Sequence, residues 1–483
     1  MTQTYKSSPY NVLIPVEERN EFLLFNTLNG GIEELKESEG MLMAELIALK
    51  AFSREMFPNE DGLMDYLINR EYLIPSQKNM VEIFESNIAH HQFKNAGTIH
   101  LTIGTTISCN MGCSYCFEFV KPNHTLKDDR VKKQTVAYVK EIIKHAGHNV
   151  HTLSVTWYGG EPLLNVRAIS DMSLGLIDLA AECNIKYSAK IITNGIYLTE
   201  ENMNILVANR VSLIQVTIDG ARDVHDRKRP LKQKNAENYY RILRNLSALP
   251  KGINVAVRLN VDREVADSAE LLLDDFEKFG VWPAKYDQVS FDPAWLRSYE
   301  EIQLNAQEKG LRMHVDDFFD FKQNFRLSLL GRFNRYADFH GLRPGKLKWD
   351  IPSYQSTCAT WASPISLVVD PNGFIHKCWE TIHDDSFAPT SVFEPYDPSK
   401  FDKFSAFNRY THNDVCRNCK YLPVCDKISC SFEALKNLVP QCTEWKYKTE
   451  SYLKEQYLRM KGSPEMMIEP RNASALNTGH SNK

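Results

Sequence analysis

The stretch Ser108–Glu118, SCNMGCSYCFE, decides the expected fold because it gathers three of the chain's eleven cysteines within eight residues. Cys109, Cys113 and Cys116 stand in a CxxxCxxC spacing. Three thiolates this close together can bind one soft metal centre. A closed zinc site needs a fourth ligand, and the nearest histidine on the C-terminal side is His124. On a [4Fe–4S] cluster, three thiolates instead leave one iron open for chemistry.

The same spacing, with Tyr115 before the last cysteine, resembles the radical S-adenosylmethionine (radical SAM) superfamily. The resemblance implies a [4Fe–4S] cluster on Cys109, Cys113 and Cys116, with SAM on the open iron and Tyr115 among the residues that contact the cofactor. It also implies that SAM is cleaved to a 5′-deoxyadenosyl radical, with an electron from an external flavodoxin or ferredoxin. A zinc knuckle, or cysteines grouped by chance, is the alternative for the triad alone.

Composition excludes several other classes. The chain of 483 residues is 43% hydrophobic and 24% charged, with a net charge of −4 and a pI near 6.4. It therefore lacks the excess of basic residues that is typical of proteins that bind nucleic acid. No apolar run approaches the roughly 18 residues of a membrane helix, and residues 1–16 do not read as a signal peptide. Eleven cysteines without an export signal indicate metal ligation in the cytoplasm rather than disulfides.

From Thr98 onward, strand patterns alternate with helical ones, which predicts βαβ units around a parallel sheet. The expected strands are His100–Thr105, Leu153–Tyr158, Ala189–Thr193, Leu213–Asp219, Asn254–Val261 and Gln288–Asp292. The expected helices are Val131–His145, Val166–Glu182, Glu200–Ala208, Asn235–Ala248 and Ser268–Phe279. The resemblance makes this α/β fold a partial (β/α)6 TIM-type barrel, open on one side for a large substrate.

Functional groups of such folds gather where the strands end. After the second strand, Gly159-Gly160-Glu161-Pro162 resembles the GGEP motif of the superfamily. The resemblance implies that the glycines let the backbone approach the SAM ammonium group, with Glu161 as a carboxylate beside that cation. An ordinary turn at the end of a strand is the alternative.

Later strand ends carry further candidate SAM contacts. Asn194 lies in a Thr-Asn-Gly ending, and Thr217 opens Thr-Ile-Asp-Gly, which resembles a Ser-Ile-Asp-Gly pattern with another hydroxyl in place of serine. Arg229 is expected near an anionic group, although its basic run also reads as a solvated loop. Arg258 and Asn260 match an R-x-N pattern, and strand alternation places both on one face. A buried structural arginine would give the same spacing.

A second cysteine system fills the C-terminal third and resembles the SPASM domain. Its order is C-x14-G-x4-C, then C-x2-C-x5-C-x4-C, then a last cysteine, and the x4 step departs from the usual x3. The resemblance assigns an outer auxiliary [4Fe–4S] cluster to Cys416, Cys419, Cys425 and Cys442, and an inner one to Cys358, Cys378 and Cys430. Spacing alone would let zinc occupy the outer set. The inner set lacks the fourth cysteine of some relatives. Cys183 is expected to be a buried core thiol.

The order of patterns divides the chain into five stretches. Residues 1–95 read as strands at Tyr10–Val16 and Glu21–Asn26, a helical stretch at Ile32–Glu37 and further small helices, the outline of a winged helix. In radical SAM enzymes of ribosomal peptides, such a segment resembles the module that binds a leader peptide by strand addition. A capping role is the alternative. The other stretches are residues 96–295 (barrel), 296–350 (helical connector), 351–450 (SPASM, with a hairpin presenting Cys378) and 451–483 (terminal helix and disordered tail).

The leading hypothesis is a radical SAM/SPASM maturase of a ribosomally made precursor peptide, similar to darobactin-type and cyclophane-forming enzymes. It would form carbon–carbon, ether or thioether crosslinks. The first rival is an anaerobic sulfatase-maturating enzyme, but that family carries an aspartate directly after the second SPASM cysteine, where this chain has Trp379 followed by Glu380. A non-catalytic iron–sulfur carrier is the rival of another class. Asp292 and Glu380 are the candidate catalytic bases, by placement.

Overall fold

Six parallel strands of a nine-stranded sheet organise the larger part of the fold. In the computed structural model, which describes residues 3–86, 97–116, 118, 122–233, 237–297, 306–346, 352, 358–405, 414–425 and 442–462, these strands stand in the order β12-β11-β10-β9-β8-β7. Every neighbouring pair is parallel. Their bounds are β7 Thr98–Thr106, β8 Thr152–Gly159, β9 Lys186–Thr193, β10 Val211–Thr217, β11 Asn254–Val261 and β12 Val289–Trp295. The predicted parallel α/β fold is therefore confirmed.

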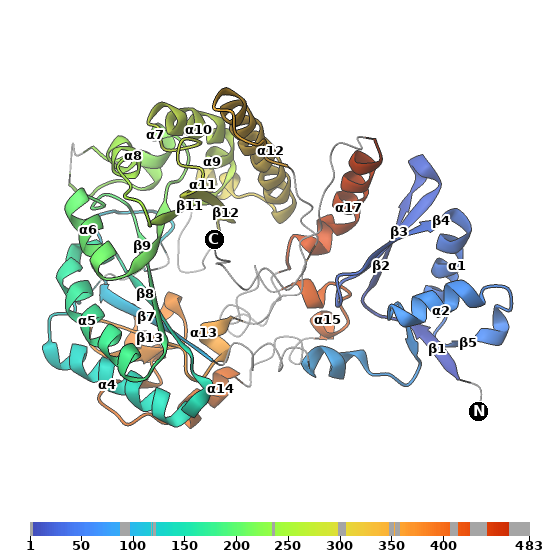
Figure 1. The fold of residues 1–483 in the computed structure, drawn as a ribbon, viewed down its shortest axis with the longest axis horizontal. Coiled ribbons are helices and arrows are strands. Elements are labelled where there is room, and N and C mark those ends of the chain that lie inside the picture. Colours follow the sequence, from blue (N-terminus) through green and yellow to red (C-terminus); the bar gives the residue numbers. More distant parts are fainter. Residues whose placement is uncertain are drawn as a thin grey trace. The chain divides into compact units, whose positions relative to one another are not determined.

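Helices alternate with these strands along the chain and lie on the outer side of the arched sheet (Figure 1). The principal ones are α4 Asp129–Ala146, α5 Val166–Glu182, α6 Glu200–Ala208, α8 Tyr239–Ser247 and α10 Ala269–Lys278, with shorter α7 Arg222–Lys228 and α9 Arg263–Asp267. Strand β11 shows most clearly why the sequence folds this way. Its Val255, Val257 and Leu259 are fully buried, whereas the alternate residues Arg258 and Asn260 are half-buried on the opposite face.

Two further helices lie in the same unit as the sheet, α11 Ala306–Leu311 and α12 Val315–Phe339. Phe325 of α12 is buried and lies edge-on to Phe291 of β12, with ring centroids 5.6 Å apart. Arg332 of α12 forms ion pairs with Glu270 and Glu277 of α10. These contacts hold α12, which lies in the stretch expected to be a helical connector, against β12 and α10.

A short hairpin extends the sheet beyond β7. Strand β13 (Leu367–Val369) runs parallel to β7. Strand β14 (Phe374–His376) pairs with β13, and β15 (Thr390–Ser391) pairs with β14, both in antiparallel fashion. The sequence predicted this hairpin but not that it would join the barrel sheet. Because β13 pairs with β7 and β14 pairs with β13, the residues that follow β14 and those that follow β7 are attached to the same sheet.

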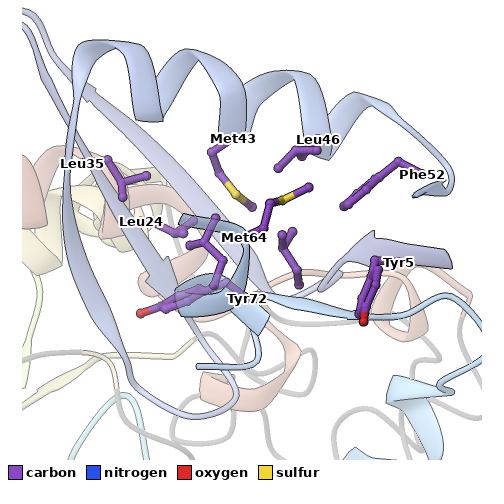
Figure 2. Packing of buried hydrophobic residues seen from close by; sticks show 10 residues of the cluster. Tyr5, Leu24, Leu35, Met43, Leu46, Phe52, Met64 and Tyr72 are labelled. Atoms are coloured by element: carbon purple, nitrogen blue, oxygen red, sulfur yellow. The ribbon is translucent and has the colours of Figure 1, made fainter. Parts of the chain in front are cut away.

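The N-terminal segment contains two small sheets and the helices α1 and α2, and its described residues 80–86 are also helical. The sheets are β2-β3-β4 (Asn11–Val16, Glu21–Asn26 and Ile32–Lys36) and β5-β1-β6 (Phe52–Ser53, Thr4–Ser7 and Leu73–Pro75); the helices are α1 Glu37–Ala48 and α2 Asp61–Asn69. Figure 2 shows Met43 and Leu46 of α1 facing Leu24, Met64 and Tyr72 in one shared core. The resemblance of this segment to a winged helix stays a prediction.

One predicted element of this segment is wrong. The stretch Ile32–Glu37, expected to be helical, forms strand β4 over Ile32–Lys36. The N–H of Gly30, which has φ +75°, donates to the carbonyl of Asn26, so the chain returns alongside β3. Pairing with β3 then overrides the helical preference of Glu33, Glu34 and Leu35.

The chain folds into two compact units, and residues of the stretch predicted as a SPASM domain belong to both of them. Residues 93–345 and 359–406 form the unit with the large sheet, and residues 1–92, 346–358 and 407–483 form the other. In this second unit, helix α17 (Trp445–Gly462) packs against β2, and Tyr457 donates from its hydroxyl to Glu21 (2.8 Å) and Glu34 (3.1 Å). The remaining short helices are α13 Ala359–Ala362, α14 Asp402–Ser405 and α15 Asp414–Arg417.

None of the described helices combines the length and the apolar character that crossing a bilayer requires. The tail predicted to be disordered falls in residues 463–483, outside the described residues. Cys183 ends helix α5 and is half-buried, so the prediction of a fully buried core thiol is wrong. Its backbone N–H caps the helix by donating to Leu179, which keeps the residue at the helix end rather than in the core.

Candidate active site at the strand ends

The loop that carries the first three cysteines, residues 107–116 (the cysteine loop), is held from two sides by backbone hydrogen bonds. On one side, the N–H of Gly160 donates to Thr106 (2.9 Å) and the N–H of Glu161 donates to Ser108 (3.0 Å). On the other side, the N–H of Gly112 donates to Pro230 (2.9 Å), and that of Lys232 donates to Asn110 (2.8 Å). The loop path is therefore set by the GGEP stretch after β8 and by residues 230–232 after α7.

The three thiols of the cysteine loop are half-buried and form no disulfide with one another. Cys109 Sγ accepts the backbone N–H of Met111 at 3.4 Å, and the side-chain amide of Asn194 lies 4.0 Å from it. Asn194 also donates to the side chain of Asn110 at 2.7 Å, which ties the end of β9 to the loop. Polar N–H groups beside a thiol stabilise its negative form, so this surrounding suits thiolate ligands.

The thiols of the cysteine loop are not arranged for a single ion. Among the described residues, one group of His, Cys, Asp or Glu side chains brings its donor atoms within 4.8 Å of one another, and it contains no cysteine. A single zinc ion with bonds of about 2.3 Å would need its sulfur ligands about 3.8 Å apart. A four-iron cluster binds each thiolate through a different iron and holds the sulfurs further apart. The described thiols therefore do not form the close three-ligand group that a zinc ion needs, and a cluster on them stays a prediction.

The two glycines of the GGEP stretch make room for the cysteine loop. Gly159 has φ +122°, and a Cβ there would lie 2.1 Å from the carbonyl oxygen of Thr106. A Cβ on Gly160 would lie 2.3 Å from the oxygen of Ile107 and 2.5 Å from that of Ser108. Any side chain at either position would push the cysteine loop away from β8. Their expected contact with the SAM ammonium group stays a prediction.

We expect the substitution Gly160→Ala to displace the cysteine loop and to lower the free energy of unfolding by about 1–3 kcal/mol, as overpacking usually does. The thermal unfolding midpoint and the iron content of the anaerobically purified protein would both fall. Gly62→Ala is the matched control, because a Cβ added at that position in helix α2 would have nothing within 4 Å. Equal iron content and equal unfolding midpoints for the two variants would contradict the packing argument.

Glu161 is fully buried and accepts hydrogen bonds from three donors. Its Oε1 accepts the hydroxyl of Thr193 (2.7 Å) and the N–H of Leu163 (3.0 Å), and its Oε2 accepts the N–H of Asn194 (2.8 Å). Burial raises the pKa of Glu161, although these hydrogen bonds oppose the shift. The carboxylate thus joins the ends of β8 and β9 and orients Asn194; a direct contact with SAM stays a prediction.

Tyr115, between the second and third cysteines, anchors the cysteine loop to residues at and beyond the strand ends. Its hydroxyl donates to Asp219 and accepts from Arg229 (2.6 Å) and Asn260 (3.4 Å). Asp219 is fully buried, accepts the backbone N–H of Asn260 at 2.8 Å and lies 3.6 Å from Arg229. Burial raises the pKa of Tyr115 well above its usual value, so the hydroxyl remains a donor.

Two members of this network were not singled out as site residues in the sequence. Asp219 lay inside the quoted Thr-Ile-Asp-Gly pattern, and His225 followed it, so the pattern was the available signal. His225 is fully buried and its Nδ1 accepts the N–H of Asp219 at 3.2 Å. Burial, reinforced by Arg229, lowers the pKa of His225 to about 3. The imidazole is therefore neutral, and it positions the turn that carries Asp219.

Arg229 keeps one unused donor in this buried setting. Its side chain is about nine-tenths buried, and its Nε has no hydrogen-bond partner among the described residues. Burial lowers the pKa of Arg229, but Cys113, Tyr115 and Asp219 together raise it well above its usual value. The guanidinium is therefore charged, and it lies close to a thiol of the cysteine loop. An unused N–H on a buried cation is suited to an anionic ligand.

The other candidate residues lie at or after strand ends. Thr217 is buried at the end of β10, in register with Arg258 of β11. Arg258 forms an ion pair with the candidate base Asp292 of β12 at 2.7 Å. The second candidate base, Glu380, lies in the single turn Trp379–Thr381 after β14 and is 3.7 Å from Arg297. Both candidate bases thus have an arginine partner.

Trp379 occupies the position that the sulfatase-maturating family fills with aspartate. Its ring lies 5.2 Å from that of Tyr158 at the end of β8, and Lys190 of β9 lies 5.9 Å from its centroid. Burial lowers the pKa of Lys190. The indole therefore packs over two barrel strands, where it fills space and offers no carboxylate.

The described cysteines of the C-terminal third fall into both units. Cys416, Cys419, Cys425 and Cys442 belong to the unit of the N-terminal segment, and burial and the nearby thiols of Cys425 and Cys442 raise the pKa of Cys419. Lys446 donates to Cys442 at 3.4 Å. The thiols of Cys419, Cys425 and Cys442 therefore lie near one another, and Lys446 lies beside that of Cys442.

The cysteines predicted to hold the inner cluster are less completely described. Cys358 is exposed and Cys378 is half-buried, and they belong to different units. Cys430, the third predicted ligand, lies outside the described residues. The ligands of both auxiliary clusters stay predictions.

Comparison with known proteins identifies the central stretch. Residues 103–272 match the model of the radical SAM superfamily, which confirms the predicted family for that part of the chain. An uncharacterized protein of Methanocaldococcus jannaschii, MJ0907, is 28% identical over 140 residues, which are 28% of this chain and 43% of that protein. The chain thus matches less than half of the length of this curated relative.

Two solved structures align with much of the chain. Native anSMEcpe with bound AdoMet and Kp18Cys peptide aligns with a TM-score of 0.52 at 16% identity, over 77% of this chain and all of that chain. Streptococcus suis SuiB bound to precursor peptide SuiA aligns with a TM-score of 0.47 at 15% identity, over 91% of this chain and 98% of SuiB. At such identity, the likeness to anSMEcpe concerns the fold alone.

Proposed function

We propose that this chain, whose residues 103–272 form a radical SAM domain, modifies a ribosomally synthesised peptide by hydrogen-atom abstraction and closes an oxidative crosslink in it. A [4Fe–4S] cluster with bound SAM would supply the 5′-deoxyadenosyl radical for this chemistry. The bond formed would be a carbon–carbon, ether or thioether link between side chains. An external donor of the flavodoxin or ferredoxin type would supply the electron.

The observation that carries the proposal is the polar setting of the cysteine loop. Cys109, Cys113 and Cys116 are reduced thiols on a loop fixed by backbone hydrogen bonds at both sides. Beside it, Arg229 offers a buried N–H without a hydrogen-bond partner among the described residues. The thiols fit a cluster with one open iron, and the guanidinium fits an anionic group such as the SAM carboxylate.

The other strand-end residues would hold SAM in one orientation. Thr217 and Asn194 offer a hydroxyl and an amide at the ends of neighbouring strands, while Glu161 orients Asn194 through its backbone N–H. Tyr115 holds the cysteine loop to Asp219 through its hydroxyl. Arg258 and Asn260 lie on one face of strand β11. Groups preset in this way need no reorganisation when the reaction starts.

Asp292 and Glu380 are the proposed acceptors of the proton that leaves the substrate after hydrogen abstraction. Asp292 lies on the last barrel strand, and Glu380 follows the hairpin that joins β7. Both are carboxylates with an arginine beside them, Arg258 and Arg297 respectively. An arginine would hold each carboxylate in place and offset its charge.

A peptide substrate is supported by the chemistry of the N-terminal segment and by a protein of similar fold. In the sheet β2-β3-β4, the outer strands of the described part are β2 and β4. An extended leader could add to such an edge through main-chain hydrogen bonds. The anSMEcpe structure holds AdoMet together with a peptide. We therefore propose residues 1–95 as a leader-binding, winged-helix-like module.

Auxiliary [4Fe–4S] clusters complete the proposal. The outer one would be held by Cys416, Cys419, Cys425 and Cys442, of which the last three lie near one another. The inner one would use Cys358, Cys378 and Cys430 of a SPASM domain in residues 351–450. Either cluster could accept the electron released when the substrate radical is oxidised, which an overall loss of two hydrogens requires.

An anaerobic sulfatase-maturating activity is the second candidate, favoured by the shared fold with anSMEcpe. That reaction oxidises a cysteine or serine to formylglycine and uses an aspartate where this chain has Trp379. The ring of Trp379 packs against Tyr158, so no carboxylate replaces the missing base at that position. This difference ranks the crosslinking reaction first.

The test is co-expression at low oxygen with each short open reading frame beside the gene, followed by mass spectrometry of the peptides. One such peptide is expected to lose two hydrogen atoms per modification, with fragmentation locating the crosslink. Co-expression with the Cys113→Ala variant is the control and should give the unmodified mass. A sulfatase peptide modified while every neighbouring peptide stays unchanged would overturn the proposal in favour of the second candidate.

A further inference from the structure

A second group of metal-type donors lies on the hairpin that extends the sheet. Asp370 follows β13, His376 ends β14, and Asp385 begins the single turn Asp385–Phe387. One ligand atom from each lies within 4.8 Å of the other two, and no other group of the described residues meets this spacing. None of the three belongs to the cysteine sets assigned above to clusters.

Asp370 directs one carboxylate oxygen into this group. The side chain is 1% exposed, and its Oδ1 accepts the N–H groups of Asn372 (3.0 Å) and Phe374 (2.7 Å), which close the hairpin turn. Its Oδ2 is buried without a nitrogen or hydroxyl donor among the described residues, and the group that interacts with this carboxyl is Asp385. Asp385 places a second carboxylate nearby. Two neighbouring carboxylates without a cation repel each other.

The hydrogen bonds around His376 fix which of its nitrogens can bind a metal. The hydroxyl of Thr381 donates its one hydrogen to the carbonyl of Cys378 at 3.0 Å. Thr381 must therefore accept from Nδ1 of His376, 3.2 Å away, so Nδ1 carries the proton. In the neutral ring Nε2 is then an acceptor, and it is buried without a hydrogen-bond partner among the described residues.

This arrangement is the one that metal-binding histidines adopt. An imidazole ligand donates its other N–H to an oxygen, which fixes the tautomer and the ring orientation. The hydroxyl of Thr381 supplies that oxygen. The unsatisfied Nε2 and Asp370 Oδ2 are thus the two atoms left for a ligand.

We propose that Asp370, His376 and Asp385 bind a divalent first-row cation, with Zn²⁺ or Mn²⁺ as the chemical class, at a site separate from the iron–sulfur clusters. One imidazole and two carboxylates suit these borderline ions better than Ca²⁺, which prefers oxygen ligands only. Asp385 is exposed and can move to close the remaining distance, and a water molecule can complete the coordination. The cation would tie the hairpin to the following turn and so position Cys378, two residues after His376.

The test is a titration of the anaerobically purified full-length protein with Mn²⁺, followed by electron paramagnetic resonance of the free ion. The wild-type protein should bind one equivalent, and Zn²⁺ should displace it. Asp385→Asn should weaken binding by at least about tenfold, because Asp385 is the one exposed ligand and can change without disturbing the core. Glu394→Gln is the matched control, since Glu394 is an exposed carboxylate paired with Lys400 outside the group.

Iron content separates loss of this site from general damage. Asp385→Asn should keep the iron content and the unfolding midpoint of the metal-free wild type while losing the rise in midpoint that Zn²⁺ gives the wild type. His376→Gln, which alters a buried ligand, should abolish the same rise. The proposal would be overturned if the wild type bound neither Mn²⁺ nor Zn²⁺. Equal binding by the wild type and Asp385→Asn would also overturn it.

Discussion

Replacing Cys113 with alanine is expected to reduce formation of 5′-deoxyadenosine from SAM to background. Cys113 is the middle one of the three proposed cluster ligands, and Arg229, the buried cation beside it, is one of the groups proposed to bind SAM. Removing one of three thiolates leaves the cluster with too few protein ligands to keep one open iron for SAM. The measurement is chromatography with mass spectrometry of 5′-deoxyadenosine under anaerobic reduction, together with iron analysis.

The matched control for this change is Cys183→Ala. Cys183 is half-buried at the end of α5 and belongs to neither cysteine array. It should keep wild-type iron and wild-type SAM cleavage. In Cys113→Ala the iron content should fall only in part, because the proposed auxiliary cysteines remain. SAM cleavage by Cys113→Ala at the wild-type rate would contradict the assignment of the cysteine loop.

The barrel was predictable because its local patterns and its tertiary structure agree. Strand β11 has the predicted bounds, Asn254–Val261, and its alternation correctly placed Arg258 and Asn260 on one face. Helices α5 and α6 also match their predicted bounds. In each of these elements the apolar residues recur with the spacing of the secondary structure and form its buried face. The secondary structure that the local sequence prefers is therefore the one that the tertiary contacts also favour.

The errors come from contacts that sequence patterns do not contain. Strand β4 has a composition that favours a helix, and only its pairing with β3 makes it a strand. Hairpin β13–β14 was predicted, but its parallel pairing with β7 joins residues more than 260 positions apart, as the bond from His100 to Ser366 also shows. Pairing partners at such separation are set by the fold as a whole.

The site was predicted in its motifs but not in its connections. Tyr115 was expected to contact the cofactor, whereas its described hydrogen bonds link it to Asp219, 104 positions away, and to Arg229. Glu161 was expected beside SAM and is found holding the backbone at the end of β9. The spacing of Asp370, His376 and Asp385 matches no motif that the sequence offered. A motif identifies residue types, but which of them meet depends on the folded strand ends.

The buried network of Tyr115, Asp219 and Arg229 leads to the second large prediction, for Asp219→Asn. Asp219 is fully buried, so its charge is balanced by Arg229 at 3.6 Å rather than by water. Asparagine keeps the shape but removes the charge, leaving a buried guanidinium without its partner. Breaking a buried ion pair in this way costs about 3–5 kcal/mol. The midpoint of thermal unfolding should fall by about 2–4 °C for each kcal/mol.

The matched control is Asp171→Asn, since Asp171 is a partly exposed carboxylate paired with Lys132 at 2.8 Å. An exposed pair of this kind contributes about 0–1 kcal/mol, so the control should unfold within a few degrees of the wild type. Asp219→Asn should also lower iron content, because Tyr115 would lose the acceptor that holds the cysteine loop, and Asp171→Asn should not. Equal destabilisation by both variants would mean that Asp219 is balanced by solvent after all, and that the cysteine loop is held by its backbone hydrogen bonds alone.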